Sequence, residues 1–345
     1  MRKELVQIAQ KLLRDLYRMK QGELLVITAD TLSDEEVVKA TESAAQQLGI
    51  KWATLWIKAP GGVAVAADKE IPRAAVAALL MQADAWAEYN KMWIYGSSAY
   101  NEVMKSNKKL RHMCLTGATG DLLAHCIGDI RYDALQLFGE KLADKVSHAG
   151  CMRMITEKGM DISFENVKGR PILKELGDAG KPGTSMLPGQ IAWTPCIESV
   201  NGTLVFDGAL APVCGVPKEP VKITVKDGKA VEVSGGAEAE AYGRWLNSFG
   251  HKQMFGISHT GLGINPGAVL SGDILQDQRV WGSVTWAFGS IGGNLVPPDG
   301  VAGPSHSDCV ALDATLLIDG KEFFRYGEVV DEAFTDLAQK VRERQ

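Results

Sequence analysis

The chain of 345 residues lacks an excess of basic charge. Its 37 Lys and Arg residues are outnumbered by 42 Asp and Glu residues, which leaves a net charge of −5 with His neutral. Nucleic-acid-binding proteins usually carry a basic surface, so this balance argues against a nucleic-acid partner. The sequence also contains no run of about 18 apolar residues, and we therefore expect no transmembrane helix and no membrane partner.

Cysteine pairs and a secretory leader are absent as well. The six cysteines are isolated from one another, with no Cys-x-x-Cys pair. The N-terminal segment is amphipathic, without the uninterrupted apolar stretch and small-residue cleavage site of a signal peptide. Isolated cysteines in a chain without a leader are typical of reduced proteins, so we expect a cytoplasmic location.

The common catalytic and nucleotide-binding motifs are missing. Lys181 lies in a Gly-Lys-Pro-Gly-Thr stretch, but proline follows the lysine where a phosphate-binding loop requires Ser or Thr. The glycines of 261–267 have the wrong spacing for a dinucleotide-binding loop. Neither Gly-x-Ser-x-Gly nor His-Glu-x-x-His occurs, which removes the usual serine hydrolase and zinc protease interpretations.

The length and composition indicate two ordinary globular domains. A domain typically has about 150 residues, and 46% hydrophobic with 23% charged residues is the balance of a folded protein. We expect an α/β domain over residues 1–150 and an α+β domain over residues 151–345.

The first 150 residues alternate between predicted helices and strands. Ser33 begins an N-cap and capping-box pattern with Glu36. This alternation predicts a mostly parallel sheet with flanking helices on both faces. The expected strands lie within 23–30, 51–57, 85–96 and 110–117, and the expected helices within 2–20, 33–49, 72–83, 97–105 and 120–150.

The pattern changes after Cys151. Residues 151–166 predict a hairpin, and residues 167–189 predict a loop-rich segment. Asp-Gly pairs at 227–228 and 319–320 are typical turns of further hairpins. With helical patterns at 237–249 and 329–343, the second half is expected to be α+β with mostly antiparallel strands.

Glycine is frequent, and its excess is local. Of the 37 glycines, 12 lie between Gly250 and Gly303, and only five of the 56 residues from 250 to 305 carry a full charge. Glycine allows tight turns and close approach of the backbone. We therefore expect a low-charge pocket built from loops in this segment.

Two of the six histidines border that segment. His259 lies between apolar residues and a glycine-rich turn, and His306 is followed two positions later by Asp308. In an extended segment, residues i and i+2 share a face, so His306 and Asp308 can bind one metal ion together. With one distant histidine, this is the donor set of a 2-His-1-carboxylate Fe(II) site. The alternative is a histidine and an aspartate on a hairpin edge. The other histidines are interpreted as surface or helix-end residues: His112, His125, His148 and His251.

Three segments resemble a known family. Residues 256–266 follow the pattern G-I-S-H-x-G-x-G-x-x-P, and with 201–208 and 305–320 they resemble the 2,5-dihydroxypyridine 5,6-dioxygenases of bacterial nicotinate degradation. That family is similar to the aminopeptidase T-like metallo-aminopeptidases of thermophiles. The resemblance covers most of the C-terminal half and rests on element order in the N-terminal half.

The resemblance implies that His259, His306 and Asp308 bind Fe(II) as the cofactor. The aminopeptidases carry glutamate ligands at the positions of Gln190 and His259, and a histidine in the segment where this chain has Thr285. The loss of these carboxylates favours one metal ion over two. One dication with two neutral imidazoles and one carboxylate keeps a net charge of +1, which suits a hydroxypyridine anion beside O2.

The implied reaction is extradiol-type ring cleavage of 2,5-dihydroxypyridine to N-formylmaleamate, or of a related hydroxylated heteroaromatic. Both atoms of O2 enter the product and no outside reductant is needed. A base takes the hydroxyl proton of the substrate. The resembling dioxygenases place a histidine after the third strand, where this chain has Tyr95 and Ser97 instead. Relatives assemble, so a homo-oligomer is expected.

Further residues are candidates for substrate binding. Aromatic side chains form either pocket walls or core, Gln190 hydrogen-bonds either the substrate or the protein, and two serines flank the metal segment. The candidates are Gln190, Trp193, Trp286, Phe288, Ser290 and Ser305.

Two other functions stay open from the sequence. One is a metallo-aminopeptidase with Zn or Co ions, and the other is a ligand-binding relative without turnover. Metal content, O2 uptake and ligand binding distinguish the three.

Overall fold

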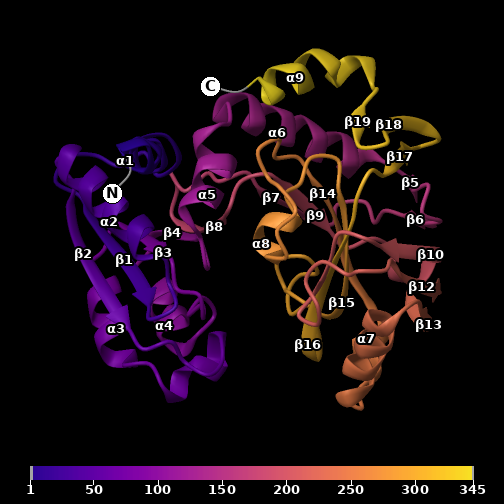
Figure 1. The fold of residues 1–345 in the computed structure, drawn as a ribbon, viewed down its shortest axis with the longest axis horizontal. Coiled ribbons are helices and arrows are strands. Elements are labelled where there is room, and N and C mark those ends of the chain that lie inside the picture. The colour runs from indigo at the N-terminus through magenta and orange to yellow at the C-terminus, as the bar shows by residue number, and fades with distance from the viewer. Residues whose placement is uncertain (1–2, 344–345) are drawn as a thin grey trace. The chain divides into compact units, whose positions relative to one another are not determined.

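A computed structural model describes residues 3–343 (Figure 1), and the chain folds into two compact units. The first unit comprises the chain up to Asp129 together with Glu175–Pro188. The second comprises Ile130–Lys174 and the chain from Gly189 onward. The division of domains at residue 150 stays a prediction.

The first unit is built on a parallel sheet with the strand order β2-β1-β3-β4-β8. Every residue of β3 and β4 is buried, as expected for parallel strands covered on both faces. The predicted parallel α/β arrangement is confirmed. The strands are β1 (Leu24–Asp30), β2 (Lys51–Ile57), β3 (Ala85–Glu88), β4 (Arg111–Cys114) and β8 (Gly183–Met186).

The fifth strand of this sheet was not expected. β8 lies in the segment predicted to be loop-rich, and it pairs in parallel with β4, with His112 opposite Thr184. A four-residue strand carries too little alternation to be recognised from sequence, and the hydrogen-bonding edge of β4 determines its conformation. His112, interpreted as a surface or helix-end residue, is fully buried on β4, which corrects that interpretation.

The helices of the first unit begin close to the expected positions. The N-cap of α2 is Asp34, whose carboxylate accepts a hydrogen bond from the backbone N–H of Glu36. Ser33, the predicted cap, instead donates its hydroxyl to the carbonyl of Tyr89. The helices are α1 (Lys3–Lys11), α2 (Glu35–Gln47), α3 (Arg73–Leu80), α4 (Ser98–Ser106) and α5 (Gly120–Leu123), with π-helical turns at Leu12–Leu16 and Ala124–Gly128 and a 3₁₀ turn at Ala64–Lys69.

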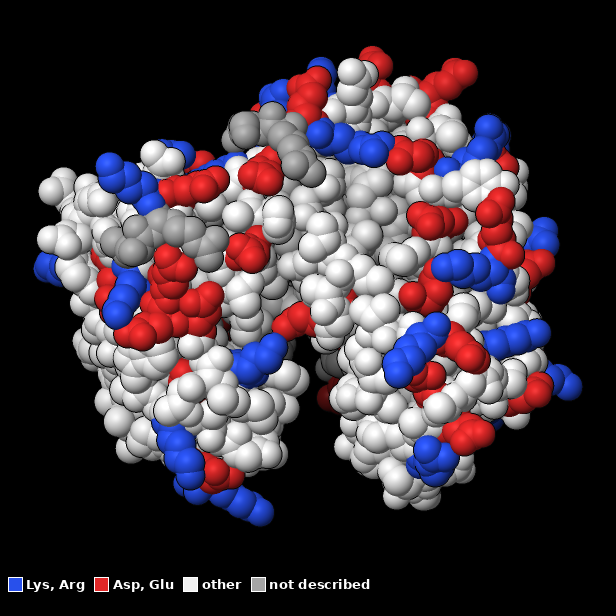
Figure 2. Space-filling view, viewed as in Figure 1, with Lys and Arg blue, Asp and Glu red and all other residues white. Residues whose placement is uncertain are grey.

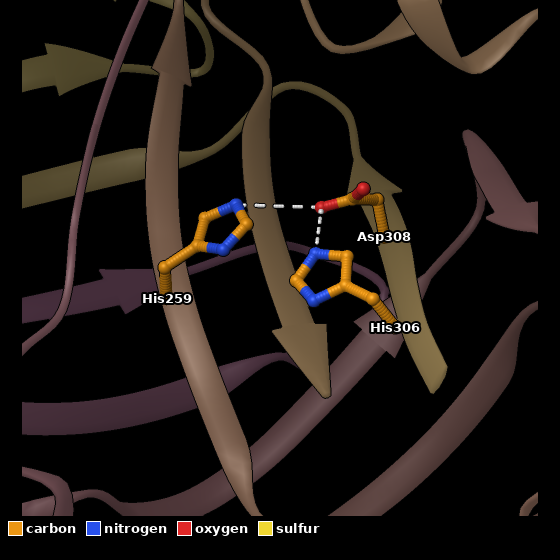
Figure 3. A group of neighbouring side chains, drawn as sticks. All are labelled: His259, His306 and Asp308. Carbon is orange, nitrogen blue, oxygen red and sulfur yellow. Dashed lines mark hydrogen bonds and ion pairs between the residues drawn. The ribbon is translucent and has the colours of Figure 1, made fainter. Parts of the chain in front are cut away.

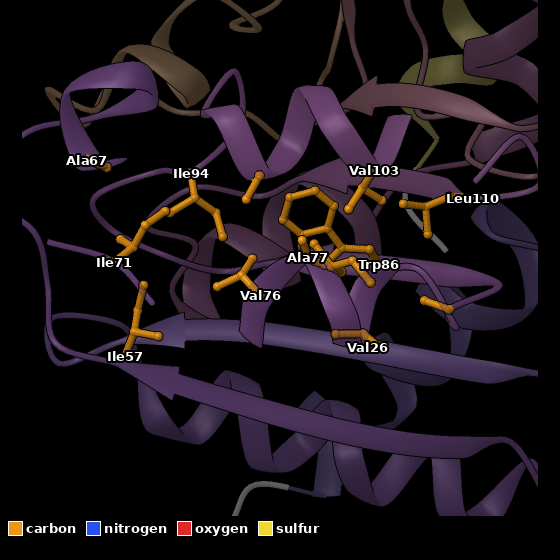
Figure 4. Packing of buried hydrophobic residues seen from close by; sticks show 13 residues of the cluster. Val26, Ile57, Ala67, Ile71, Val76, Ala77, Trp86, Ile94, Val103 and Leu110 are labelled. Atoms are coloured by element: carbon orange, nitrogen blue, oxygen red, sulfur yellow. The ribbon is translucent and has the colours of Figure 1, made fainter. Parts of the chain in front are cut away.

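Trp86 lies in the core between this sheet and the helices α3 and α4 (Figure 4). It packs in one buried cluster with Val76 of α3 and Val103 of α4. Its buried indole N–H keeps a hydrogen-bond partner, because it donates to the hydroxyl of Thr28 at 2.9 Å.

The second unit contains two antiparallel sheets, which confirms the predicted α+β character. The eight-stranded sheet has the order β13-β12-β10-β6-β5-β17-β18-β19. Its strands are β5 (Cys151–Ile155), β6 (Asp161–Glu165), β10 (Asn201–Phe206), β12 (Val221–Lys226), β13 (Lys229–Ser234), β17 (Thr315–Ile318), β18 (Lys321–Arg325) and β19 (Glu328–Val329). The two predicted Asp-Gly turns are confirmed, since Asp227 and Gly228 have φ of 48° and 70°, and Asp319 and Gly320 have φ of 48° and 78°.

The six-stranded sheet has the order β11-β16-β15-β14-β9-β7. The rings of Phe164 on β6 and Trp286 on β15 meet edge to face at 5.1 Å, so the two sheets share buried aromatic core. The strands are β7 (Ile172–Glu175), β9 (Gln190–Trp193), β11 (Ala209–Ala211), β14 (Ile257–Gly263), β15 (Val284–Ile291) and β16 (Val301–Ala311).

The segment 120–150 was predicted to be one helix, and its second part is a helix of this unit. That segment is interrupted after Gly128, and its longer part, α6, contacts α9 and β9. The helices are α6 (Tyr132–His148), α7 (Ala237–Ser248), α8 (Ile274–Asp277) and α9 (Glu332–Arg342), with 3₁₀ turns at Ile197–Ser199 and Lys252–Phe255.

Charged side chains of both signs lie on the surface of the protein. On the face drawn in Figure 2, basic and acidic side chains are interspersed and no continuous basic area is visible. Between residues 3 and 343, no helix has the length and apolar character needed to cross a membrane.

Replacing Asp34 with alanine is expected to destabilise the first unit by about 1–2 kcal/mol. The carboxylate caps α2 and also accepts the backbone N–H of Gly120 at 3.1 Å. Chemical denaturation measures the free energy of unfolding. Glu35→Ala is the matched control, because Glu35 forms an exposed ion pair with Lys39, and loss of such a pair changes stability by less than about 0.5 kcal/mol. Equal stability of the two variants would contradict the capping role.

Candidate metal centre

Three side chains with metal-binding atoms meet on the six-stranded sheet (Figure 3). His259 comes from β14, whereas His306 and Asp308 come from β16. Oδ1 of Asp308 lies 3.3 Å from Nε2 of His259 and 3.3 Å from Nε2 of His306. One ligand atom of each residue lies within 4.8 Å of the others, and within residues 3–343 no second group of three or more His, Cys, Asp and Glu side chains is arranged in this way.

Strand alternation explains how β16 contributes two of the three residues. His306 and Asp308 are two positions apart on a strand, so both project from the same face. Ser307 between them projects from the other face, where it is buried and lies 2.8 Å from the hydroxyl of Tyr242. The three candidate ligands therefore lie on strands in the middle of a sheet, whereas the sequence suggested a pocket built from loops.

Small residues on β15 allow His259 to reach its partners on β16. β15 lies between β14 and β16, and its Ala287 and Gly289 are paired with Asp308 and His306. Paired residues of neighbouring strands share a face, so only a methyl group and a hydrogen atom occupy β15 between the ligands. Strands lie about 4.8 Å apart, and the imidazole of His259 spans the gap over β15.

A β-bulge turns His259 toward this face. β14 has one extra residue relative to β15 between Ile257 and Thr260. Ser258 and His259 therefore lie opposite Ala287 alone, and such a bulge redirects a side chain. The register of the sheet, more than the local sequence around His259, determines where its imidazole lies.

A backbone carbonyl orients the imidazole of His306. Its Nδ1 lies 2.9 Å from the carbonyl oxygen of Ser290, which also accepts the hydroxyl of Ser258 at 2.8 Å. A carbonyl can only accept, so Nδ1 carries the proton and Nε2 is left for Asp308 or a metal ion. The two imidazole rings are nearly parallel, at 11° with centroids 5.2 Å apart.

The carboxylate and the imidazoles stabilise each other's charged forms. Burial would raise the pKa of Asp308, but the charge of His306 and the hydrogen bonds from His306 and His259 lower this pKa far below its usual range. Burial would likewise lower the pKa of His306, but the charge of Asp308, their hydrogen bond and the Ser290 carbonyl raise it to about 9. Without a metal ion, a proton on His306 therefore balances the carboxylate.

The donor set fits a small divalent ion. Ligand atoms at about 2.1 Å from such an ion lie about 3 Å apart when they occupy adjacent positions. The 3.3 Å separations between Asp308 Oδ1 and the two Nε2 atoms are close to this value. Two imidazoles and one carboxylate are the ligands of facial non-haem Fe(II) sites.

Gln190 lies on the same sheet face as the three ligands. It is buried on β9, and its Nε2 donates to the hydroxyl of Thr285 at 3.4 Å. This hydrogen bond crosses β14 at Gly261. A side chain at that position would place its Cβ atom 3.0 Å from Nε2 of Gln190. Gln190 thus extends the polar face along the sheet.

The three aromatic candidates occupy the opposite face. Trp193 is paired with Thr260, and Trp286 and Phe288 are paired with Cys309 and Ser307, which face away from Asp308. Trp286 and Phe288 are fully buried, and the indole N–H of Trp193 donates to the side-chain oxygen of Asn166 at 2.9 Å. Their predicted contact with substrate stays a prediction.

The remaining candidates have identified local roles. The carbonyl of Ser290 orients His306, and the carbonyl of Ser305 lies against Gly289. Tyr95 and Ser97 belong to the first unit. The hydroxyl of Ser97 caps α4 by accepting the backbone N–H of Tyr100, and the Tyr95 ring packs against that of Tyr100 at 4.9 Å. Their catalytic role stays a prediction.

Sequence reasoning missed Ala287 and Gly289. Gly289 has a φ of +104°, and a Cβ there would lie 2.3 Å from the carbonyl oxygen of Ser305. The sequence signal was the run of alternating large and small residues over 284–289, which indicates one apolar and one small face once the segment is known to be a strand.

Ala287→Leu is expected to weaken divalent metal binding by at least about tenfold, because the larger side chain would occupy the gap that His259 crosses. Anaerobic titration calorimetry with Fe(II) measures the affinity, and circular dichroism checks the fold. Ala287→Ser adds one oxygen and is expected to bind metal normally. Metal binding by the leucine variant with wild-type affinity would contradict this account.

The stability of the metal-free protein is expected to depend on pH through His306. Its pKa is raised from 6.5 to about 9 in the folded state, so its contribution is fully present below pH 6.5 and is lost as the pH rises through 9. The stability difference between the wild type and His306→Gln should therefore shrink across this interval in urea denaturation. A difference that is constant from pH 6 to 9.5 would contradict the ion pair.

Comparison with known proteins identifies the family of this chain. Residues 4–331 match the family described as NicX, 2,5-dihydroxypyridine 5,6-dioxygenase. A 2,5-dihydroxypyridine 5,6-dioxygenase from Pseudomonas putida (strain KT2440) is 27% identical over 170 residues, which cover 46% of this chain and 49% of that protein. The match to this curated relative therefore spans about half of its length.

Two solved structures share the fold. The structure of 2,5-dihydroxypyridine dioxygenase from Pseudomonas putida KT2440 has a TM-score of 0.77 at 21% identity, over 96% of this chain and 98% of that one. Wild-type AmpT from Thermus thermophilus has a TM-score of 0.69 at 12% identity, over 95% and 99%. The family match confirms the resemblance seen in the sequence, and this chain belongs to the 2,5-dihydroxypyridine 5,6-dioxygenase family.

Proposed function

We propose that this protein is a mononuclear non-haem Fe(II) dioxygenase that opens the ring of 2,5-dihydroxypyridine or a closely related hydroxylated heteroaromatic. The observation that carries the proposal is the cluster of His259, His306 and Asp308 in a chain of this family. Fe(II) bound there would supply the electron transfer between ring and O2 that no side chain can supply. The product expected from 2,5-dihydroxypyridine is N-formylmaleamate, with both oxygen atoms of O2 incorporated.

The metal-free protein already holds the donor atoms in position. The hydrogen bond from His306 to the Ser290 carbonyl keeps Nε2 free, and such second contacts raise metal affinity by roughly 10–100-fold. Asp308 carries the only negative charge of the three ligands. A dication held by these residues keeps a net charge of +1, which attracts a deprotonated hydroxypyridine.

Gln190 is our candidate for a substrate contact. It shares a face with the candidate ligands, and its Nε2 donates to the hydroxyl of Thr285. An amide oxygen accepts a hydrogen bond from a ring N–H or hydroxyl group. Homo-oligomeric assembly and a cytoplasmic location belong to the same proposal.

The donor set supports one metal ion rather than the two of an aminopeptidase. Two adjacent dications need several bridging or terminal carboxylates, and this group contains only Asp308. Gln190 and His259 stand where the resembling aminopeptidases carry glutamates. AmpT shares the fold at 12% identity, and a shared fold does not determine the reaction.

Reconstitution with Fe(II) under nitrogen, followed by oxygen-electrode measurements with 2,5-dihydroxypyridine, tests the proposal. We expect about one iron per chain and one O2 consumed per ring opened. Asp308→Asn is expected to lower turnover by more than about 100-fold, because it removes the only charged ligand. Asp299→Asn is the matched control, since Asp299 is an exposed aspartate of the same low-charge segment.

Two results would contradict the proposal. One is the absence of O2 uptake with every hydroxylated pyridine and catechol tested on iron-loaded protein. The other is hydrolysis of an aminoacyl p-nitroanilide by Zn- or Co-loaded protein without O2, which would support a metallo-aminopeptidase instead.

A further inference from the structure

The bulge that carries His259 interrupts the pairing of β14 on both of its sides. Toward β15, residues 258 and 259 lie opposite Ala287 alone. Toward β9, the paired residues end at Thr260 and Trp193. A bulge disrupts the hydrogen-bond ladder of a sheet, and buried backbone groups need other partners where the ladder is disrupted.

A side chain of the segment after β9 supplies one of these partners. The register of β9 and β14 would place Pro195 opposite Ser258, and proline has no backbone N–H to donate. The hydroxyl of Thr194 donates to the carbonyl oxygen of Ser258 at 2.8 Å instead. Thr194 and Ser258 are both fully buried, so this carbonyl is satisfied inside the protein.

The hydroxyl of Ser258 ties the bulge to β15 as well. It donates to the carbonyl oxygen of Ser290 at 2.8 Å, and the same carbonyl lies 2.9 Å from Nδ1 of His306. Ser258 is therefore held toward β9 through its carbonyl and toward β15 through its hydroxyl. The second bond ends on the oxygen that orients one imidazole of the candidate metal centre.

His259 follows Ser258 directly, so its side chain leaves the backbone at the anchored position. Its Nε2 points to Oδ1 of Asp308 at 3.3 Å (Figure 3), and its Nδ1 lies 3.5 Å from the hydroxyl oxygen of Ser258. The direction of a side chain follows the backbone that carries it. The two hydroxyl groups that anchor Ser258 thus act on the direction of the neighbouring imidazole.

We propose that Thr194 and Ser258 are positioning residues of the metal centre, whose hydroxyl groups hold the bulge of β14 in the geometry from which His259 reaches the metal ion. Neither belongs to the three-residue cluster of candidate ligands. The inference rests on the proposed function only for the presence of a divalent metal ion at that cluster. Without the Thr194 bond the buried carbonyl of Ser258 lacks this partner, the bulge relaxes, and the imidazole of His259 moves away from Asp308.

A purely structural role for these hydroxyl groups would lower stability without changing which residues bind the metal. The test therefore detects the ligands themselves. The full-length protein is treated with chelator and loaded with Co(II) under nitrogen. Calorimetric titration gives the affinity, and proton NMR detects the ring N–H of each coordinated imidazole as an exchangeable resonance shifted by the paramagnetic ion. We expect two such resonances in the wild type, and His259→Gln identifies the one that belongs to His259.

Thr194→Val keeps the shape of the side chain and removes its hydroxyl. We expect it to lower the Co(II) affinity at least about tenfold and to remove or displace the resonance of His259, while that of His306 stays. Thr194→Ser keeps a hydroxyl and should restore both the affinity and the spectrum. Ser258→Ala removes the bond to Ser290 and is expected to act in the same direction, which provides a second test if the valine variant does not fold.

Thr41→Val is the matched control. It removes a buried hydroxyl that donates to the carbonyl of Val37 at 2.9 Å in the first unit, and it should keep both resonances and the wild-type affinity. Substrate and O2 take no part in these measurements, so failed ring cleavage by a wild type with two resonances would contradict the proposed function alone. Wild-type affinity with both resonances in Thr194→Val or in Ser258→Ala, or absence of Co(II) binding to the wild type, would overturn the positioning role.

Discussion

The carboxylate of Asp308 on β16 lies between the imidazole of His306 on the same strand and the imidazole of His259 on β14. The candidate metal centre therefore depends on the side chain of His259 reaching across β15, the strand that lies between β14 and β16. The distance between alternate strands of a sheet is about 9.6 Å, which two ordinary side chains on a middle strand would fill. Ala287 and Gly289 leave that space open, and the bulge at Ser258 and His259 directs the imidazole into it. The rigidity of the sheet then holds all three ligand atoms within 4.8 Å.

The electrostatics of the centre follow from this close approach. Asp308 is a partly buried carboxylate, and a charge removed from water is costly unless it is paired and hydrogen-bonded. The two imidazoles provide that pairing. Few other charges occur in the segment from 250 to 305, so a cation bound by Asp308 meets little competition from neighbouring carboxylates. The arrangement that stabilises a proton on His306 is the same one that makes the three residues a candidate site for a divalent ion.

Fold and chemistry are determined at different levels in this protein. The structures from Pseudomonas putida and Thermus thermophilus share its architecture over at least 95% of its length, although one is a 2,5-dihydroxypyridine dioxygenase and the other is AmpT. In this chain the candidate donor set consists of His259, His306 and Asp308.

Much of the architecture could be predicted because its causes are local. Short apolar runs between helical patterns predict β1 to β4, Asp-Gly pairs predict two hairpins, and His306 and Asp308 share a face through their spacing alone. The rest needed tertiary structure. β8 is a strand because β4 offers it hydrogen bonds, and His112 is buried because Glu88 and Thr184 come to it from neighbouring strands. The approach of His259 to Asp308 depends on register and on a bulge, which arise from pairing between distant segments and leave no local signal.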